Sequence, residues 1–261
     1  MNRLNALSTT VALIVTCLAA GAIAADEDAV APEETAVAFA DRVLIKLSGW
    51  NLAASRSALD EKKEAFGETA SYRTALGLLE AEEGELDKAL KTLETASRAD
   101  ANDPAPEFYR GMVLYWKKNA TGSRDAWQKA STSAKNVIAR QEKDARAHFY
   151  LGASQVYLKQ YGPARTSLEK ALANGFDEVM VNYYIGLSFA FEQNWKKAKE
   201  SLDRVLGEDE RFAYAYFYRG MVWEKLGRKD NMLVDMDQFV KLAPDAPDAG
   251  KAKALLAAAS R

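Results

Sequence analysis

The hexapeptide Phe-Tyr-Arg-Gly-Met-Val occurs twice in this sequence, at Phe108–Val113 and at Phe217–Val222. Weaker copies lie between them, Phe149-Tyr150-Leu151-Gly152 and Tyr183-Tyr184-Ile185-Gly186, and Ala75-Leu76-Gly77-Leu78 precedes them. Each copy places one glycine after an aromatic or aliphatic pair. A chain that repeats one short pattern along most of its length is expected to repeat one structural unit.

The glycines of these copies keep a fixed spacing. Gly77 and Gly111 are 34 residues apart, as are Gly152 and Gly186, and Gly186 and Gly220. The interval from Gly111 to Gly152 is 41 residues, which is seven more. A period in this range is typical of a repeat array, in which each unit packs mainly on its neighbours.

Each unit follows one plan around its glycine. About twelve residues after the glycine comes an alanine, followed at helical spacing by a large apolar residue and then a small one. Small residues let two helix backbones approach closely, and the large residue fills the space beside them. The plan therefore predicts a pair of packed helices in each unit. The residues that carry it are Gly77, Ala89, Leu93 and Ala96; Gly152, Ala164, Leu168 and Ala171; Gly186, Ala198, Leu202 and Val205; and, more loosely, Gly220, Met232, Met236 and Phe239.

The unit that begins near residue 104 carries the seven-residue surplus. Its alanine stripe, Ala126, Ala130 and Ser133, falls three residues later than the plan. We expect three surplus residues in the turn around Asn119–Ser123. The other four are expected within Ser131–Asp144, where about one extra helical turn leaves the apolar face in register.

This pattern resembles the tetratricopeptide repeat (TPR), a helix–turn–helix unit with Leu-Gly in its first helix, alanine in its second and proline after it. The matching positions are Leu76-Gly77, Leu151-Gly152, Ile185-Gly186, Ala89, Ala164, Ala198 and Pro244. Arg110 and Arg219 stand where the family prefers leucine, and most closing prolines are missing. The resemblance covers about residues 70–244. It implies an all-α fold, a right-handed α-solenoid of helix–turn–helix repeats with capping helices at both ends.

The expected organisation has five repeats between two capping elements. Residues 35–69 are predicted to form an N-terminal capping helix pair or a degenerate repeat, and residues 247–261 a C-terminal capping helix whose apolar face is Ala252, Leu255, Leu256 and Ala259. Repeat arrays need such caps to cover apolar ends. The predicted repeats are 70–103, 104–144 with the surplus, 145–178, 179–212 and 213–246.

The N-terminus reads as a targeting segment. Residues 1–24 have the pattern of a secretory signal peptide: Arg3, an apolar run over Val11–Ala20, and Ala22-Ile23-Ala24 before the cleavage point. Residues 25–34, rich in acids and alanine, read as a disordered leader. We expect an exported protein, periplasmic or secreted. The alternative is an uncleaved anchor, since Ala6–Ala25 is about long enough to span a bilayer, and only then would the chain contact a membrane.

Composition argues against several functions. The formal net charge is −2, whereas a general nucleic-acid binder carries a basic face. Cys17 and His148 are the only cysteine and histidine, so the sequence offers no Cys/His metal cluster and no Cys–His nucleophile. We expect His148 to be packed or capping, and we expect neither enzyme activity nor a cofactor.

Aromatic residues cluster on the first helix of each unit. The TPR resemblance implies that one side of this helix lines the concave face of the array. Packing between repeats is the alternative interpretation, and it explains part of the cluster. The repeat pattern does not require the further aromatics Tyr115, Trp116, Tyr157 and Phe191. We therefore predict a groove for an extended apolar segment or an amphipathic helix of a partner. Its predicted residues are Phe108, Met112, Tyr115, Trp116, Phe149, Tyr157, Tyr183, Leu187, Phe191, Phe217 and Met221.

Together these features predict a non-catalytic interaction scaffold or adaptor in the cell envelope. Its partners are expected to be proteins or peptides, without nucleic acid or a small-molecule cofactor. The alternative is an accessory or regulatory subunit of an envelope enzyme or of a secretion or assembly complex.

Overall fold

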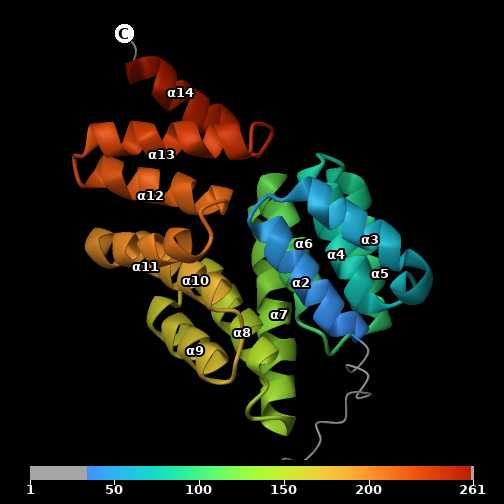
Figure 1. The fold of residues 1–261 in the computed structure, drawn as a ribbon. Coiled ribbons are helices and arrows are strands. Elements are labelled where there is room, and N and C mark those ends of the chain that lie inside the picture. Colours follow the sequence, from blue (N-terminus) through green and yellow to red (C-terminus); the bar gives the residue numbers. More distant parts are fainter. Residues whose placement is uncertain (1–33, 260–261) are drawn as a thin grey trace, which may run out of the picture. The chain divides into compact units, whose positions relative to one another are not determined.

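The computed structural model describes residues 34–259, and within this range the chain forms α-helices and no strand. Consecutive helices pack as pairs, and the pairs stack in sequence order (Figure 1). This arrangement confirms the predicted all-α solenoid. The predicted signal peptide, and all of the predicted leader except residue 34, lie outside the described residues. The helices are α2 (Ala36–Ser48), α3 (Leu52–Phe66), α4 (Ala70–Glu82), α5 (Leu86–Ala99), α6 (Ala105–Trp116), α7 (Ala120–Arg140), α8 (Ala145–Tyr157), α9 (Tyr161–Ala173), α10 (Glu178–Phe191), α11 (Trp195–Glu208), α12 (Ala213–Lys225), α13 (Lys229–Leu242) and α14 (Ala249–Ala259).

The repeated glycines are where the two helices of a pair touch. A Cβ atom added to Gly152 would lie 2.6 Å from Cγ of Leu168, and one added to Gly111 would lie 2.4 Å from Nε1 of Trp127. Both distances are far below van der Waals contact. The predicted reason for the glycines, close approach of paired helices, is therefore confirmed.

The turns inside the pairs also repeat. Each has three residues, and the middle one has a positive φ: Gly84, Lys118, Lys159, Gln193 and Gly227. The left-handed conformation is unstrained for glycine but costs other residues roughly 1–2 kcal/mol. Lys118, Lys159 and Gln193 therefore hold strained turns that the surrounding packing maintains.

The surplus of the second repeat lies entirely in its second helix. α7 has 21 residues, whereas α5, α11 and α13 have 14 each, and the α6–α7 turn has the usual length. The expected lengthening of the turn is wrong. Ser123, Trp127 and Ala130 hold the standard positions 12, 16 and 19 residues after Gly111, with Trp127 in the place of the usual leucine. Seven residues add about two helical turns and so preserve the register.

Helix α2 lies against the first helices of later repeats as well as at the end of the array. Its apolar face is buried through Phe39, Ala40, Val43, Leu44 and Leu47. Just beyond its C-terminus, the amide of Ala213 at the start of α12 donates to the carbonyl of Gly49 over 3.3 Å. The rings of Trp50 and Tyr214 lie 5.8 Å apart. The N-terminal helix pair therefore reaches the fifth repeat.

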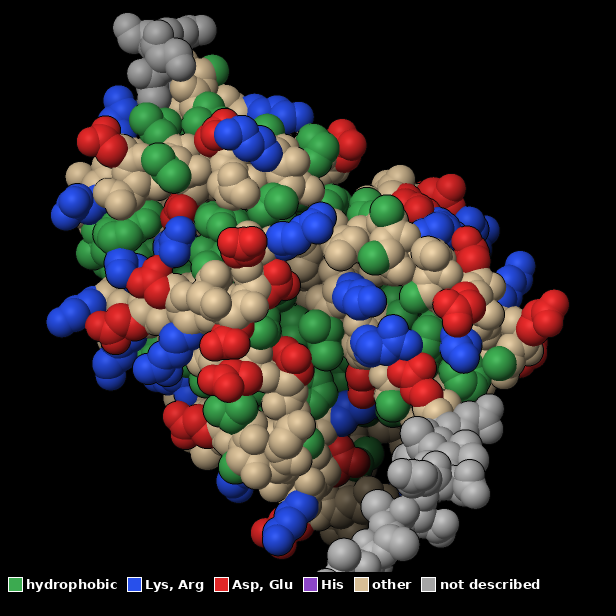
Figure 2. Space-filling view, viewed as in Figure 1, with side chains coloured by type: hydrophobic (Ala, Val, Ile, Leu, Met, Phe, Trp, Pro, Cys, Tyr) green, Lys and Arg blue, Asp and Glu red, His purple; other side chains and the backbone are tan. Residues whose placement is uncertain are grey.

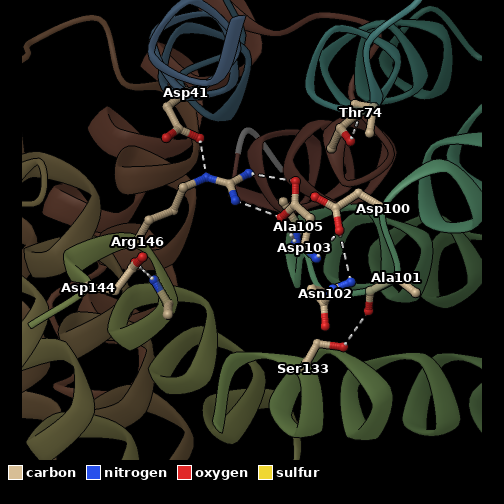
Figure 3. A network of polar contacts seen from close by, with 12 residues as sticks. Asp41, Thr74, Asp100, Ala101, Asn102, Asp103, Ala105, Ser133, Asp144 and Arg146 are labelled. Carbon is tan, nitrogen blue, oxygen red and sulfur yellow. Dashed lines mark hydrogen bonds and ion pairs between the residues drawn. The ribbon is translucent and has the colours of Figure 1, made fainter. Parts of the chain in front are cut away.

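A buried ion network fixes α2 to the array (Figure 3). Arg146 of α8 donates through Nε to Asp41 of α2 over 2.8 Å, and through Nη1 to Asp103 over 2.6 Å. Asp103 also accepts from the backbone amide of Ala105 at the start of α6. Burial alone would lower the pKa of Arg146, but Asp103 and Asp41 together raise it well above its ordinary value. Burial raises the pKa of Asp41, against the opposing effect of Arg146.

The C-terminal helix α14 packs on α13. Ala252 is fully buried, while Leu255 and Leu256 are half-buried. Within residues 34–259, no helix combines the length and apolar character needed to cross a bilayer.

Candidate partner-binding site

The first helices of the five repeats, α4, α6, α8, α10 and α12, share one cavity of about 350 Å³. This volume is near the lower end of the roughly 300–1,000 Å³ typical of ligand pockets. We call it the aromatic cavity, because most of its wall is aromatic. Its aromatic lining is Tyr115, Trp116, Trp127, Tyr157, Tyr161, Tyr183, Tyr184, Phe191, Tyr214 and Tyr218, and the remaining lining is Ser48, Leu78, Glu82, Met112, Val156, Lys159 and Asp248.

Repeat geometry explains why these side chains converge. The first helix of each repeat ends at or near the fifth residue after the repeat glycine. In four repeats this residue lines the cavity. These four residues are Glu82, Trp116, Tyr157 and Phe191. Because stacked repeats place equivalent positions on one face, a single register position builds much of the wall.

The rings form a continuous chain of contacts. Trp127 stacks on Tyr157, with ring centroids 4.4 Å apart and planes at 11°. Stacked and edge-on rings attract each other beyond their buried area, by about 0.5–1.5 kcal/mol for each pair. Centroids 6.1–6.4 Å apart continue the chain, from Tyr115 to Trp127, from Tyr157 to Phe191, from Phe191 to Tyr218 and from Tyr218 to Tyr214. The wall is thus held in place by its own packing.

Two carboxyl groups and several phenols interrupt the apolar wall. Glu82 is 7% exposed, and its Oε2 has no hydrogen-bond partner. The hydroxyl of Tyr214 is also buried, and it interacts with the carboxyl group of Asp248. Burial, with the nearby charges of Asp248 and Glu82, raises the pKa of Tyr214 well above its ordinary value. Burial likewise raises the pKa of Asp248, although Lys251 opposes this effect. The cavity therefore has acceptor groups whose bonds are not all made within the protein.

Six of the eleven predicted groove residues meet at the aromatic cavity, and two of these are markedly exposed, Tyr115 at 59% and Phe191 at 37%. The others of the six are Met112, Trp116, Tyr157 and Tyr183. That the six contact a partner stays a prediction.

The other five predicted groove residues do not line the aromatic cavity. Four of the other predicted residues are buried in the core between repeats, Phe108, Phe149, Leu187 and Phe217. Met221 is half-buried against that core and is not part of the cavity wall. The physical reason is that their rings and chains fill the space between successive first helices. Phe108, for example, contacts the rings of Tyr150, Tyr157 and Tyr184.

Sequence reasoning missed Glu82, Trp127 and the phenols of α12. Glu82 was detectable, because it occupies the same repeat position as Trp116, Tyr157 and Phe191. Trp127 was detectable as the residue 16 positions after Gly111, where other repeats have leucine or methionine. Asp248 follows the last repeat, and no periodic signal marks it.

The histidine belongs to the packing, as predicted. His148 is 4% exposed, and its Nε2 lies 2.8 Å from the carbonyl oxygen of Glu142, to which it donates. The part of the chain that the structure describes contains no group of three or more His, Cys, Asp or Glu side chains able to hold a metal ion.

Charged side chains of both signs are interspersed on the face shown in Figure 2, with hydrophobic side chains between them. That face has no continuous basic patch of the kind expected of a nucleic-acid binder. Many charged side chains of the described residues pair locally, as in the ion pairs of Lys199 with Asp203 and of Arg219 with Asp203 and Asp235.

Comparison with known proteins agrees with the repeat architecture. A tetratricopeptide repeat family model matches residues 214–246, which correspond to the fifth repeat. None of the curated protein sequences matches the chain.

Solved structures share the fold at low sequence identity. A thermophilic TPR protein from Thermus thermophilus is 18% identical, with a TM-score of 0.56 over 72% of this chain and 99% of that chain. The Cut9–Hcn1 hetero-tetramer of the APC/C contains a chain that is 16% identical, with a TM-score of 0.50. That match covers 87% of this chain and 43% of the other.

Proposed function

We propose that this chain, whose fifth repeat matches the tetratricopeptide repeat model and whose fold is shared with TPR proteins, is a non-catalytic scaffold that binds a partner protein at the aromatic cavity. Stacked repeats of this kind provide the concave surfaces on which protein partners are held. The proposed point of attachment is this cavity, which holds six of the eleven predicted groove residues. The partner anchors one or two side chains there rather than lying along the whole inner face.

One observation carries this proposal: Tyr115 and Phe191 are the exposed large aromatic side chains of the described residues, and both lie on the wall of the same cavity. Burying a large aromatic ring contributes strongly to binding at low cost in side-chain entropy. Two such rings at the rim of a preformed apolar cavity have the composition of a binding hot spot.

We further propose that the protein acts in the cell envelope after export. The support is the sequence of residues 1–24, with its positive start, apolar centre and small residues before Ala25. Mass measurement of the protein from an envelope extract tests this, since cleavage before Ala25 predicts a chain that begins Ala-Asp-Glu-Asp. A mass that includes Met1 would instead indicate an uncleaved segment.

The binding proposal is tested with Tyr115→Ala combined with Phe191→Ala. Both side chains are exposed, so helicity by circular dichroism should be unchanged, while partner recovery in co-purification from the source cells should fall at least about tenfold. The matched control is Val234→Ala, because Val234 is 68% exposed and lies on α13, away from the cavity. Equal recovery with the double variant and with the control would refute the proposed site.

A further inference from the structure

Glu82 is an acid at a buried position of the cavity wall, where an apolar side chain would cost less free energy. It occupies the repeat position that is aromatic in the next three repeats, and it is 7% exposed with Oε2 unpartnered. A buried acceptor without a partner costs about 1–3 kcal/mol, and a charged one costs more. An aliphatic or aromatic residue at this position would avoid that cost. The presence of an acid therefore indicates a ligand group that its carboxyl can bind.

No cation within the described residues compensates Glu82. The charge that acts on it most is that of Glu83, another acid, and Glu83 itself pairs with Arg56. Asp248, the second carboxyl of the cavity, has Lys251 close enough to oppose the rise in its pKa. Lys159 lines the cavity but is exposed to solvent. The negative charge of the cavity wall that lacks a compensating cation is therefore that of Glu82.

The remaining wall suits an organic cation. Aromatic ring faces carry a negative quadrupole, which attracts ammonium and guanidinium groups, and the attraction strengthens where water is excluded. Trp116, Tyr157 and Phe191 supply such rings, and the buried phenol oxygen of Tyr214 can accept a hydrogen bond. An apolar stem fits between rings, and a charged head requires an acceptor such as Glu82.

We infer that the aromatic cavity takes a lysine or arginine side chain presented by the partner, with its stem against the rings and its charge paired with Glu82. This inference rests on the proposed function, because it names the group that the partner inserts. It assigns Glu82 the role of counter-ion and explains why the first repeat carries an acid where the next three repeats carry rings.

The inference is tested by titrating the full chain with N-acetyl-lysine methylamide and N-acetyl-arginine methylamide. Trp116 and Trp127 line the cavity, so tryptophan fluorescence reports occupancy, and calorimetry checks the affinity. We expect saturable binding of at least one of these cationic probes. The neutral probe N-acetyl-norleucine methylamide should bind about tenfold or more weakly, since a hydrogen bond to a charged group contributes about 1.5–3 kcal/mol.

Glu82→Gln keeps the shape of the side chain and removes its charge, and it should weaken the cationic probes about tenfold or more while leaving the norleucine probe unchanged. Glu83→Gln is the matched control, because the neighbouring acid pairs with Arg56 outside the cavity, and it should bind as the wild type does. Equal binding of cationic and neutral probes, or unchanged binding by Glu82→Gln, would overturn the inference. Tighter binding of tetramethylammonium than of either side-chain probe would assign the cavity to a free cation and overturn the side-chain assignment.

The outcome also separates this inference from the proposed function. If a partner is recovered equally well by wild type and Glu82→Gln, and the cationic probes do not bind, then the scaffold proposal stands and the counter-ion role fails. If the cationic probes bind but no partner is recovered, the scaffold proposal fails.

Discussion

Arg146 on α8 donates a 2.8 Å hydrogen bond to Asp41 on α2, a residue 105 positions earlier in the chain. Through the same guanidinium Arg146 also holds Asp103, which accepts from the first amide of α6. One cation thus joins the N-terminal helix pair, the second repeat and the third. This contact fixes α2 to the second and third repeats, whereas a helix that only capped the array would pack on its end.

Arg146→Met is expected to destabilise the protein by about 2–4 kcal/mol, because it leaves the buried carboxylate of Asp103 and the half-buried one of Asp41 without their cation. Urea unfolding followed by circular dichroism measures the change. Adding Asp41→Asn to Arg146→Met should recover part of the loss. The control is Arg98→Met, whose exposed pair with Glu94 should change stability by no more than about 0.5 kcal/mol. Similar losses for both arginines would contradict the assigned role of Arg146.

Gly111→Ala is expected to destabilise by about 1–3 kcal/mol, because its Cβ would lie 2.4 Å from Nε1 of Trp127. Thermal unfolding measures this loss. Gly207→Ala provides the opposite expectation, since Gly207 lies within α11 and a Cβ there meets nothing within 4 Å. Alanine at 207 should leave stability unchanged or raise it by up to about 1 kcal/mol. A loss at 207 as large as that at 111 would show that glycine is not needed specifically for helix contact.

Glu82→Gln is expected to stabilise the protein at neutral pH. Burial raises the pKa of Glu82 well above 4.5, with Glu83 adding to the effect. The folded state therefore holds this proton to a higher pH than the unfolded state, and folding stability falls as pH rises from the unfolded pKa through the folded pKa. Glutamine removes this penalty, so the variant should unfold at a higher temperature at pH 7.

The same linkage predicts that the difference shrinks as the pH falls below about 4.5, where Glu82 is protonated in both states. Differential scanning calorimetry at pH 4 and pH 7 checks this, since even 1 kcal/mol shifts Tm by about 2–4 °C in a chain of this size. A variant that is less stable than the wild type at pH 7 would mean that Glu82 has a stabilising partner.

The fold was largely predictable because its signal is periodic. The glycine spacing and the residues at 12, 16 and 19 positions beyond each glycine define helix pairs from local pattern alone. The placement of the surplus failed for a specific reason. The alanines at 126 and 130 suggest a shifted alanine stripe. In fact Trp127 is a large residue in the leucine position, and it keeps the register unchanged.

The candidate site was only partly predictable, because burial depends on contacts between distant parts of the chain. Both Phe108 and Tyr115 are predicted groove residues, but Phe108 is enclosed by tyrosines of the third and fourth repeats, whereas Tyr115 is 59% exposed. The reach of α2 to Arg146 and Ala213 has no periodic signature. The convergence of Glu82 and Asp248 on one cavity likewise follows from how the repeats curve, not from spacing.

The most direct measurement is site-specific photo-crosslinking in the source cells, with p-benzoylphenylalanine introduced at position 115 in one variant and at position 234 in another. Both native side chains are more than half exposed, but only Tyr115 lines the aromatic cavity. We predict a discrete protein adduct at position 115, identified by mass spectrometry and absent at position 234. The same adducts at both positions, or none at position 115, would contradict the claim that the aromatic cavity is where this protein holds its partner.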